Sequence, residues 1–245
     1  MRTVIIVQAR MTSTRLPGKV LKTVLGKPLL EYQIERLRRV KLADEIVIAT
    51  TVNETDQPIV ELCQRLGVSC TRGSEEDVLA RYYEAAKQYR ADVVVRVTSD
   101  CPVIDPEVID EAIRFYLDRQ GECDYVSNGL KRTYPRGMDA EVFPFRVLAE
   151  AYNEAVDPPE REHVTPFIYR RPQRYRVANV MLEQNQGNHR WTVDTLEDLE
   201  LVSRIIADLY PVNPSFSMQD ILDLLARHPD WSEINAHIEQ KKLGQ

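Results

Sequence analysis

The chain has 245 residues, of which 43% are hydrophobic and 29% are charged, and its formal net charge is −6. This length fits one large α/β domain or two small ones, and the acidic balance argues against a nucleic-acid-binding surface. No apolar run is long enough to cross a membrane and no signal-peptide core follows the N-terminus, so we expect a cytoplasmic protein with neither a nucleic-acid nor a membrane partner.

Strand-like and helix-like segments alternate through the first half of the chain, which is the pattern of a mostly parallel sheet flanked by helices. We expect strands over residues 4–7, 45–50, 68–71 and 92–97, and helices over residues 29–40, 57–66, 75–89 and 106–119. The run at 92–97 is the most continuously apolar, as expected of a central parallel strand buried on both faces. This half therefore predicts an α/β fold.

The second half has shorter strand candidates and more proline. We expect strands over 124–127, 140–143 and 175–181, a helix over 145–155, a proline-punctuated arm over 157–172, an exposed loop over 183–188 and a mostly helical stretch over 196–245. Residues 124–190 are a candidate lid or dimer arm, but no change of composition is strong enough to mark a linker. We therefore expect a single domain over residues 1–245.

The four cysteines lack C-x-x-C spacing, and the four histidines form no paired metal motif. These patterns argue against a disulfide framework and against a zinc site.

A basic loop follows the first predicted strand and closes with Pro17, Gly18 and Lys19. Residues 1–30 contain six Lys or Arg and no Asp or Glu, so the cations of this loop have no acid beside them in the sequence. A loop of this kind at the end of a strand is suited to a polyphosphate, whereas each cation alone is more often a solvated surface charge. The candidate nucleotide-binding residues are Gln8, Ala9, Arg10, Met11, Ser13, Thr14, Arg15, Gly18 and Lys19, with Ser99 from a later strand.

The loop matches neither of two common nucleotide motifs. A Walker A motif would need a glycine where Ser13 stands and a metal-binding hydroxyl where Val20 stands. No G-x-G-x-x-G follows any predicted strand, which excludes the dinucleotide fingerprint.

Two carboxylates follow strand-like runs. Asp100 comes after the central run, at the carboxyl end of a strand, where ligands bind in open parallel sheets. Asp194 comes after residues 190–193, which we interpret as another strand. The alternative for the stretch that begins at Asp194 is a helix cap, with Thr195, Glu197 and Asp198 in that role. Asp105 is predicted to cap the helix that begins at Pro106.

The loop over residues 8–19 resembles, nearly residue for residue, the nucleotide-binding signature of the acidic-sugar cytidylyltransferases, which include acylneuraminate and 3-deoxy-manno-octulosonate cytidylyltransferases. The stretches 134–143 and 161–168 look closest to the spore-coat polysaccharide, SpsF-like branch, and the resemblance extends to about Asp198. It implies a Rossmann-like nucleotide-diphospho-sugar transferase (GT-A-like) fold with a mixed, mostly parallel central sheet flanked by helices. The sequence around Asp100 departs from the octulosonate enzymes, because Ser99 and Cys101 flank it.

The resemblance also implies an activity. The expected reaction transfers CMP from CTP to an acidic (2-keto-3-deoxy) sugar and releases pyrophosphate, in surface polysaccharide or spore-coat biosynthesis. Asp100 and Asp194 match the family's magnesium ligands, so Mg²⁺ is the expected cofactor. We expect Arg10, Arg15 and Lys19 to hold the phosphates. A homodimer is expected from the family and from the proline-rich arm.

A carboxylate on the sugar needs a cation or oriented N–H donors. Asp139 and Glu141 alternate along one predicted strand face, which suits hydrogen bonds to sugar hydroxyls, although Glu141 has the alternative of pairing with a nearby arginine. The candidate sugar-binding residues are Arg136, Asp139, Glu141, His163, His189 and Arg190.

Other functions are compatible with the same fold. A glycosyltransferase commonly holds its metal with an Asp-x-Asp motif, which this sequence lacks. A nucleotidyltransferase that acts on sugar 1-phosphates is a second alternative. A non-catalytic nucleotide-binding protein would need the basic loop but not the two carboxylates, so it ranks third.

Overall fold

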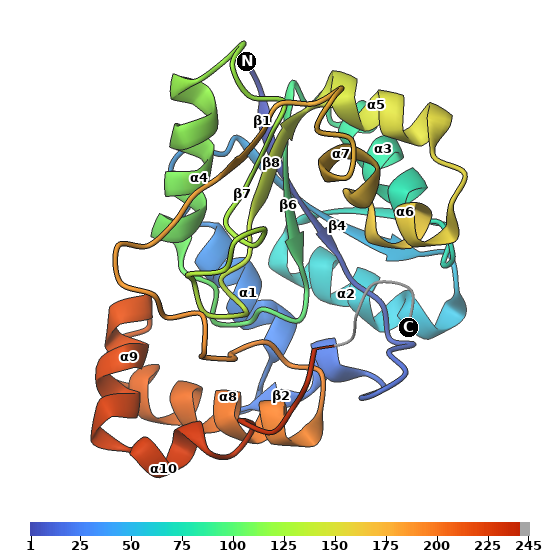
Figure 1. The fold of residues 1–245 in the computed structure, drawn as a ribbon. Coiled ribbons are helices and arrows are strands. Elements are labelled where there is room, and N and C mark those ends of the chain that lie inside the picture. The colour runs from blue at the N-terminus through green and yellow to red at the C-terminus, as the bar shows by residue number, and fades with distance from the viewer. Residues whose placement is uncertain (241–245) are drawn as a thin grey trace.

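The computed structural model describes residues 1–240, and its centre is one seven-stranded sheet with helices on both faces (Figure 1). The strands are β1 (Thr3–Gln8), β4 (Glu45–Thr51), β5 (Ser69–Gly73), β6 (Val93–Thr98), β7 (Tyr125–Ser127), β8 (Glu141–Pro144) and β9 (Val177–Asn179). Their order is β5-β4-β1-β6-β8-β7-β9, and β8 is antiparallel to both of its neighbours while all other pairs are parallel. The expected mixed, mostly parallel sheet is therefore confirmed.

The apolar strands bury side chains on both faces of the sheet. In β1, Val4 and Ile6 belong to one core cluster, whereas Ile5 and Val7 belong to the other. Successive side chains of a strand point to opposite faces, so an unbroken apolar run is what a doubly covered parallel strand requires. This explains why the continuous apolar runs in the sequence became the central strands.

Helices cover each face in turn. One core cluster joins the sheet to α1 (Leu29–Leu37), α2 (Gln57–Leu66), α4 (Pro106–Asp118), α8 (Leu196–Leu209) and α9 (Met218–Arg227). The other joins it to α3 (Val78–Gln88), α5 (Phe145–Glu154) and α7 (Pro166–Tyr169). The short helix α6 (Pro158–His163) packs on α3, and α10 (Pro229–Ser232) packs on α9.

Helix boundaries follow local capping. Asp77 begins α3 because its side chain accepts a hydrogen bond from the Ala80 amide, so the helix starts later than the predicted residue 75. Asp105 accepts a hydrogen bond from the Glu107 amide, which confirms the predicted cap of α4. The helix predicted to reach residue 40 ends at Leu37.

The shortest elements were not predicted. Two-residue strands β2 (Thr23–Val24) and β3 (Lys27–Pro28) pair in a separate hairpin, and single 3₁₀ turns occupy η1 (Lys19–Leu21) and η2 (Glu54–Asp56). Segments this short carry no hydrophobic periodicity for a sequence to display. The strand expected over 175–181 contracts to β9, and the proline-punctuated arm contains α6 and α7.

The region considered as a lid or dimer arm, residues 124–190, contributes β7, β8 and β9 to the central sheet. The last five residues of the expected helical stretch, 241–245, lie outside the described residues. Within residues 1–240, no helix combines the length and the apolar character needed to cross a bilayer.

Residues 190–193 are extended but do not form a strand of the sheet, contrary to the prediction. The Trp191 amide donates to the Arg136 carbonyl at 2.7 Å, and the Val193 amide donates to the Asp100 carbonyl at 2.8 Å. Gly137 permits this approach, because its φ is +99° and a Cβ there would lie 2.7 Å from the Trp191 carbonyl carbon. Asp194 is thus brought beside Asp100 by backbone contacts outside the sheet.

Candidate active site

A cavity of about 700 Å³ opens at the carboxyl ends of β1 and β6. This is the position where open α/β sheets bind ligands. Most of the predicted site residues line it, namely Gln8, Ala9, Arg10, Ser13, Thr14, Arg15, Lys19, Ser99, Asp100, Arg136, Asp139, Glu141, His163 and Asp194. Four predicted residues lie outside its lining, namely Met11, Gly18, His189 and Arg190.

Met11 and Gly18 shape the loop that follows β1. The Gly18 amide donates to the Met11 carbonyl at 2.8 Å, and Gly18 has a positive φ of 67° that favours glycine. The Met11 amide donates to the buried carboxylate of Asp56 at 2.7 Å. Asp56 also accepts from the hydroxyls of Thr50 and Thr51, so β4 anchors the loop and fixes its curvature.

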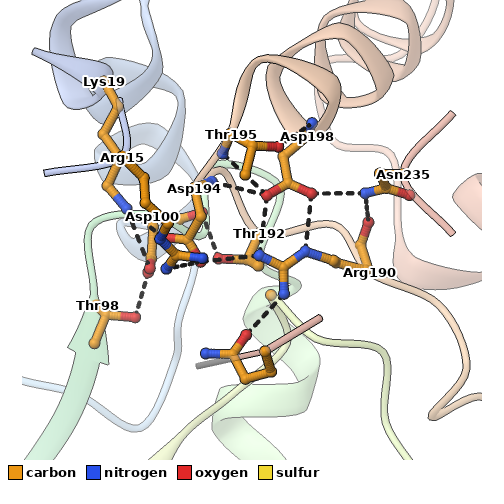
Figure 2. Close-up of polar contacts among 12 residues, drawn as sticks. Arg15, Lys19, Thr98, Asp100, Arg190, Thr192, Asp194, Thr195, Asp198 and Asn235 are labelled. Atoms are coloured by element: carbon orange, nitrogen blue, oxygen red, sulfur yellow. Dashed lines mark hydrogen bonds and ion pairs between the residues drawn. The ribbon is translucent and has the colours of Figure 1, made fainter. Parts of the chain in front are cut away.

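The loop cations pair with acids that come from distant parts of the chain. The Lys19 Nζ lies 2.7 Å from the Asp194 Oδ1 and 3.4 Å from the Asp100 Oδ2, and the Arg15 Nη2 lies 2.9 Å from the Asp194 Oδ2 (Figure 2). Arg10 lies 3.6 Å from Glu75. These cations therefore have acid partners in the structure, although no acid lies near them in the sequence.

The charges at this end of the cavity stabilise one another. Burial alone would raise the pKa of Asp100, but the Lys19 ammonium and the Thr98 hydroxyl lower it to about 2. Burial alone would lower the pKa of Lys19, but Asp100 and Asp194 raise it above its ordinary value. Asp100 and Lys19 are therefore both charged at neutral pH.

Asp100 and Asp194 are the carboxylates best placed to hold a metal ion. Both contact one Lys19 nitrogen, so their oxygens converge on one region of the cavity. Among residues 1–240 there is no group of three or more His, Cys, Asp or Glu side chains arranged to hold a metal. Two carboxylates that leave other positions to water and phosphate oxygens suit a hard divalent cation such as Mg²⁺.

Arg190 lies behind Asp194. Its buried guanidinium makes two hydrogen bonds to Asp198, at 2.8 and 3.0 Å, and its Nη2 donates to the Asp194 Oδ2 at 3.0 Å. Asp198 and Thr195 also form the capping box of α8, which confirms the cap alternative for those two residues. Arg190 thus orients Asp194 from outside the cavity lining.

His189 also lies away from the lining, with its ring centroid 5.5 Å from that of Trp191. Burial lowers the pKa of His189. The arrangement gives His189 a packing contact with Trp191.

A second part of the lining is formed by Arg96, Arg132, Arg136, Asp139, Glu141, His163 and Thr165, and we call it the far end of the cavity. It contains an ion pair that belongs to the sheet. The Arg96 Nη1 on β6 donates to the Glu141 carboxylate on β8 at 2.7 Å, and its Nη2 donates to Gln8 at 3.1 Å. Glu141 also accepts from the hydroxyls of Tyr125 and Thr165, at 2.8 and 3.1 Å. The alternative that Glu141 pairs with a nearby arginine is confirmed.

A second pair lies beside the first, and one arginine next to it has no acid partner. Asp139 pairs with Arg132 and accepts from the Gly137 amide at 3.0 Å. Within the described part of the chain, the Arg136 side chain makes no ion pair and no hydrogen bond. Burial and the nearby Arg132 lower the pKa of Arg136. Among the described residues, Arg136 therefore lines the cavity with no direct acid partner, and the Asp139 carboxylate acts on it only at longer range.

His163 and Thr165 line the same end from α6 and the loop before α7. Val164 between them has a φ of 71°, a conformation that β-branched residues rarely adopt. Strain of this kind tends to occur at functional sites. Burial lowers the pKa of His163 below its ordinary value.

Sequence reasoning missed several lining residues. Arg96 carried a usable signal, because a charged side chain inside a continuous apolar strand needs a buried partner. Arg81 lies on the longer helix α3. Other missed residues lie in loops or short helices with no distinguishing pattern, namely Arg132, Glu162, Thr165, Tyr169, Thr192 and Gln240.

Comparison with known proteins bears directly on this site. A family model described as cytidylyltransferase matches residues 4–219, which include the loop, Asp100, Arg136 and Asp194. The chain belongs to the cytidylyltransferase family. The resemblance inferred from the sequence is confirmed, and so is the coarse prediction of a nucleotidyltransferase.

The relatives of this chain match either nearly all of it or about half of it. It is 34% identical over 232 residues to the spore coat polysaccharide biosynthesis protein SpsF of Bacillus subtilis, which covers 92% of this chain and 94% of that protein. It is 39% identical over 115 residues to 3-deoxy-manno-octulosonate cytidylyltransferase of Pelobacter propionicus, a match that covers 46% of this chain and 44% of that enzyme.

A solved structure has the same fold over the whole length. The structure of a cytidylyltransferase from Leptospira borgpetersenii superposes with a TM-score of 0.91 at 32% identity, and the match covers 99% of this chain and 100% of that one. The predicted nucleotidyltransferase fold is thereby confirmed.

Proposed function

We propose that this cytidylyltransferase transfers CMP from CTP to an acidic (2-keto-3-deoxy) sugar, with Mg²⁺, in the biosynthesis of surface polysaccharides or glycans. One observation carries the proposal. A single cavity is lined by two paired cations, by two convergent carboxylates and by Arg136, which has no direct acid partner among the described residues. The names of the relatives, a polysaccharide biosynthesis protein and an octulosonate cytidylyltransferase, support the same substrate class.

At the first end, the loop over residues 8–19 would hold the triphosphate. Its backbone N–H groups and the side chains of Arg10, Arg15 and Lys19 are the phosphate-binding groups. Because Lys19 and Arg15 are already paired with carboxylates, nucleotide binding would exchange those partners for phosphate oxygens. That exchange leaves Asp100 and Asp194 free to bind a cation.

Mg²⁺ held by Asp100 and Asp194 would supply positive charge that stabilises the charge developing on the phosphate oxygens. Lys19 and Arg15 contribute fixed positive charge to the same region. In this reaction the sugar hydroxyl attacks the α-phosphate and pyrophosphate leaves. The residues of the protein position the two substrates and neutralise the phosphate charge, and they form no covalent intermediate.

At the far end, Arg136 is the group we assign to the sugar carboxylate. Asp139 and Glu141 are held in place by Arg132 and Arg96, and each retains acceptor capacity for sugar hydroxyls. His163 is proposed to contact the sugar from the other wall. The homodimer, the cytoplasmic location and the spore-coat role stay predictions.

The test is pyrophosphate release with Mg²⁺, each of the four nucleoside triphosphates, and a panel of acidic sugars, neutral sugars and sugar 1-phosphates. Release that requires CTP and one acidic sugar is expected. Release only with a sugar 1-phosphate would replace the acceptor. No release with any pair would contradict the proposal and favour a glycosyltransferase or a binding protein.

A further inference from the structure

The segment that follows α10 contacts Arg190 and Asp198, the residues next to the Asp194 carboxylate. The match to the cytidylyltransferase family model ends before this segment, at residue 219. Asn235 is buried there, and its Nδ2 donates to the Arg190 carbonyl at 2.9 Å and to the Asp198 Oδ1 at 2.8 Å (Figure 2). Further along, the Gln240 Oε1 accepts from the Arg190 Nη1 at 2.7 Å, and Gln240 also lines the cavity. This part of the chain therefore reaches the site.

Arg190 uses all three of its guanidinium nitrogens. Nε donates to Asp198, Nη2 donates to Asp198 and Asp194, and Nη1 donates to Gln240. Arg190 is 7% exposed, whereas Gln240 is exposed and lines the cavity, so Gln240 is the group that covers Nη1 on the cavity side. Gln240 supplies the acceptor for Nη1, and it lies after residue 219, where the family-model match ends.

Arg190 in turn orients Asp194. The Asp194 Oδ2 lies 2.9 Å from Arg15 and 3.0 Å from Arg190, while its Oδ1 lies 2.7 Å from Lys19. Arg15 and Lys19 line the cavity, and the proposed function requires both to turn to phosphate. Arg190 remains as the contact that keeps the Asp194 carboxylate in place during that exchange.

We propose that Asn235 and Gln240 are positioning residues, which fix Arg190 and through it the orientation of Asp194 toward a divalent cation. The active site would then include the C-terminal segment 235–240, which lies after residue 219, where the match to the family model ends. This inference rests on the proposed function, which places a divalent cation on Asp100 and Asp194 and brings CTP to the cavity.

The experiment uses the full chain and three single variants. Gln240→Ala removes the acceptor, Gln240→Glu retains an acceptor oxygen, and Glu239→Ala is the matched control at an exposed neighbour outside the cavity lining. Mn²⁺ binding is measured directly by electron paramagnetic resonance with CTP present, and pyrophosphate release is measured in parallel. Asn235→Ala is added as a fourth variant, with thermal melting to show whether it folds.

Gln240→Ala is expected to weaken Mn²⁺ binding about 10-fold, because partners behind a metal ligand typically contribute that much. Gln240→Glu and Glu239→Ala are expected to keep wild-type binding, and the KM for the sugar should stay unchanged in all three. Equal Mn²⁺ binding by Gln240→Ala and Glu239→Ala, or no Mn²⁺ binding by the wild type, would overturn the inference. A wild type that binds Mn²⁺ but releases no pyrophosphate would instead contradict the proposed function.

Discussion

The two ends of the cavity are built differently. At the end near the loop after β1, Lys19 and Arg15 pair with Asp100 and Asp194 across the space that a ligand would fill. At the far end, Glu141 pairs with an arginine of the neighbouring strand, and Asp139 pairs with Arg132 along its own wall. On the proposed function, the first set of pairs opens when the nucleotide binds, whereas the second set stays closed.

This difference indicates separate tasks. Ion pairs that span a cavity can exchange partners, so that their cations bind an anionic ligand and their carboxylates bind a metal cation. Ion pairs between residues of one wall hold the direction of their remaining lone pairs, which on the proposed function would select among sugar hydroxyls. Arg136 is the exception at the far end, because its charge has no carboxylate partner among the described residues.

The largest effect is expected where pairs must exchange. Lys19→Ala and Asp100→Asn should each lower the rate of pyrophosphate release about 10²–10³-fold, because each removes a charge that acts on the transferring phosphate. Lys22→Ala, three residues further along and outside the cavity lining, is the matched control and should leave the rate unchanged. Normal turnover by either test variant would remove that residue from the mechanism.

An intermediate effect is expected at Arg136. Arg136→Ala should raise the KM for the acidic sugar about 10- to 100-fold, since a charge-assisted hydrogen bond contributes about 1.5–3 kcal/mol, and should leave the KM for CTP unchanged. Steady-state kinetics that give the KM of both substrates test this prediction. Arg170→Ala, an exposed arginine outside the lining, is the control. If the KM for CTP rises instead, Arg136 serves the nucleotide.

The sequence was most informative where a residue's neighbours in space follow from strand order. The loop after β1 and Asp100 after β6 meet because parallel strands present their carboxyl ends at one edge, and the apolar runs reveal those strands. Arg190 was assigned to the sugar, yet it points behind Asp194. That direction depends on Asp198 and on backbone contacts far along the chain, which no periodicity encodes.

The same limit applies to charge pairing. The sequence shows a basic N-terminal stretch free of acids, but the partners of Arg15 and Lys19 are about 80 to 180 residues away. Only the tertiary fold brings them together, and a single sequence does not specify which acid meets which base. The fold class could therefore be predicted in more detail than the electrostatics of the site.

The smallest effect on activity is expected for an ion pair outside the cavity. Asp124 is buried, and hydrogen bonds from Arg176, with help from Arg146, lower its pKa to about 2, below the unfolded value of roughly 3.9. The resulting stability is present above about pH 4 and is lost as the pH falls toward 2. Asp124→Asn should thus reduce the free energy of unfolding by about 1–2 kcal/mol at pH 7, after allowance for the exposed arginines, with turnover unchanged.

Urea unfolding at a series of pH values tests this, because the difference between wild type and variant should shrink as the pH approaches 2. A difference that stays constant with pH would mean that the Asp124 charge contributes nothing. A loss of turnover would show that ion pairs outside the cavity also matter for the reaction.

The contact between the backbones of residues 136 and 191 has a consequence for how such an enzyme can diversify. Gly137 allows the two main chains to touch, and hydrogen bonds link Arg136 to Trp191 and Val193 to Asp100. Main-chain atoms therefore fix the position of residue 136 relative to residues 100 and 193. On the proposed function, the side chains around Arg136 can then change to suit another acceptor without moving the backbone that carries Asp100 and Asp194.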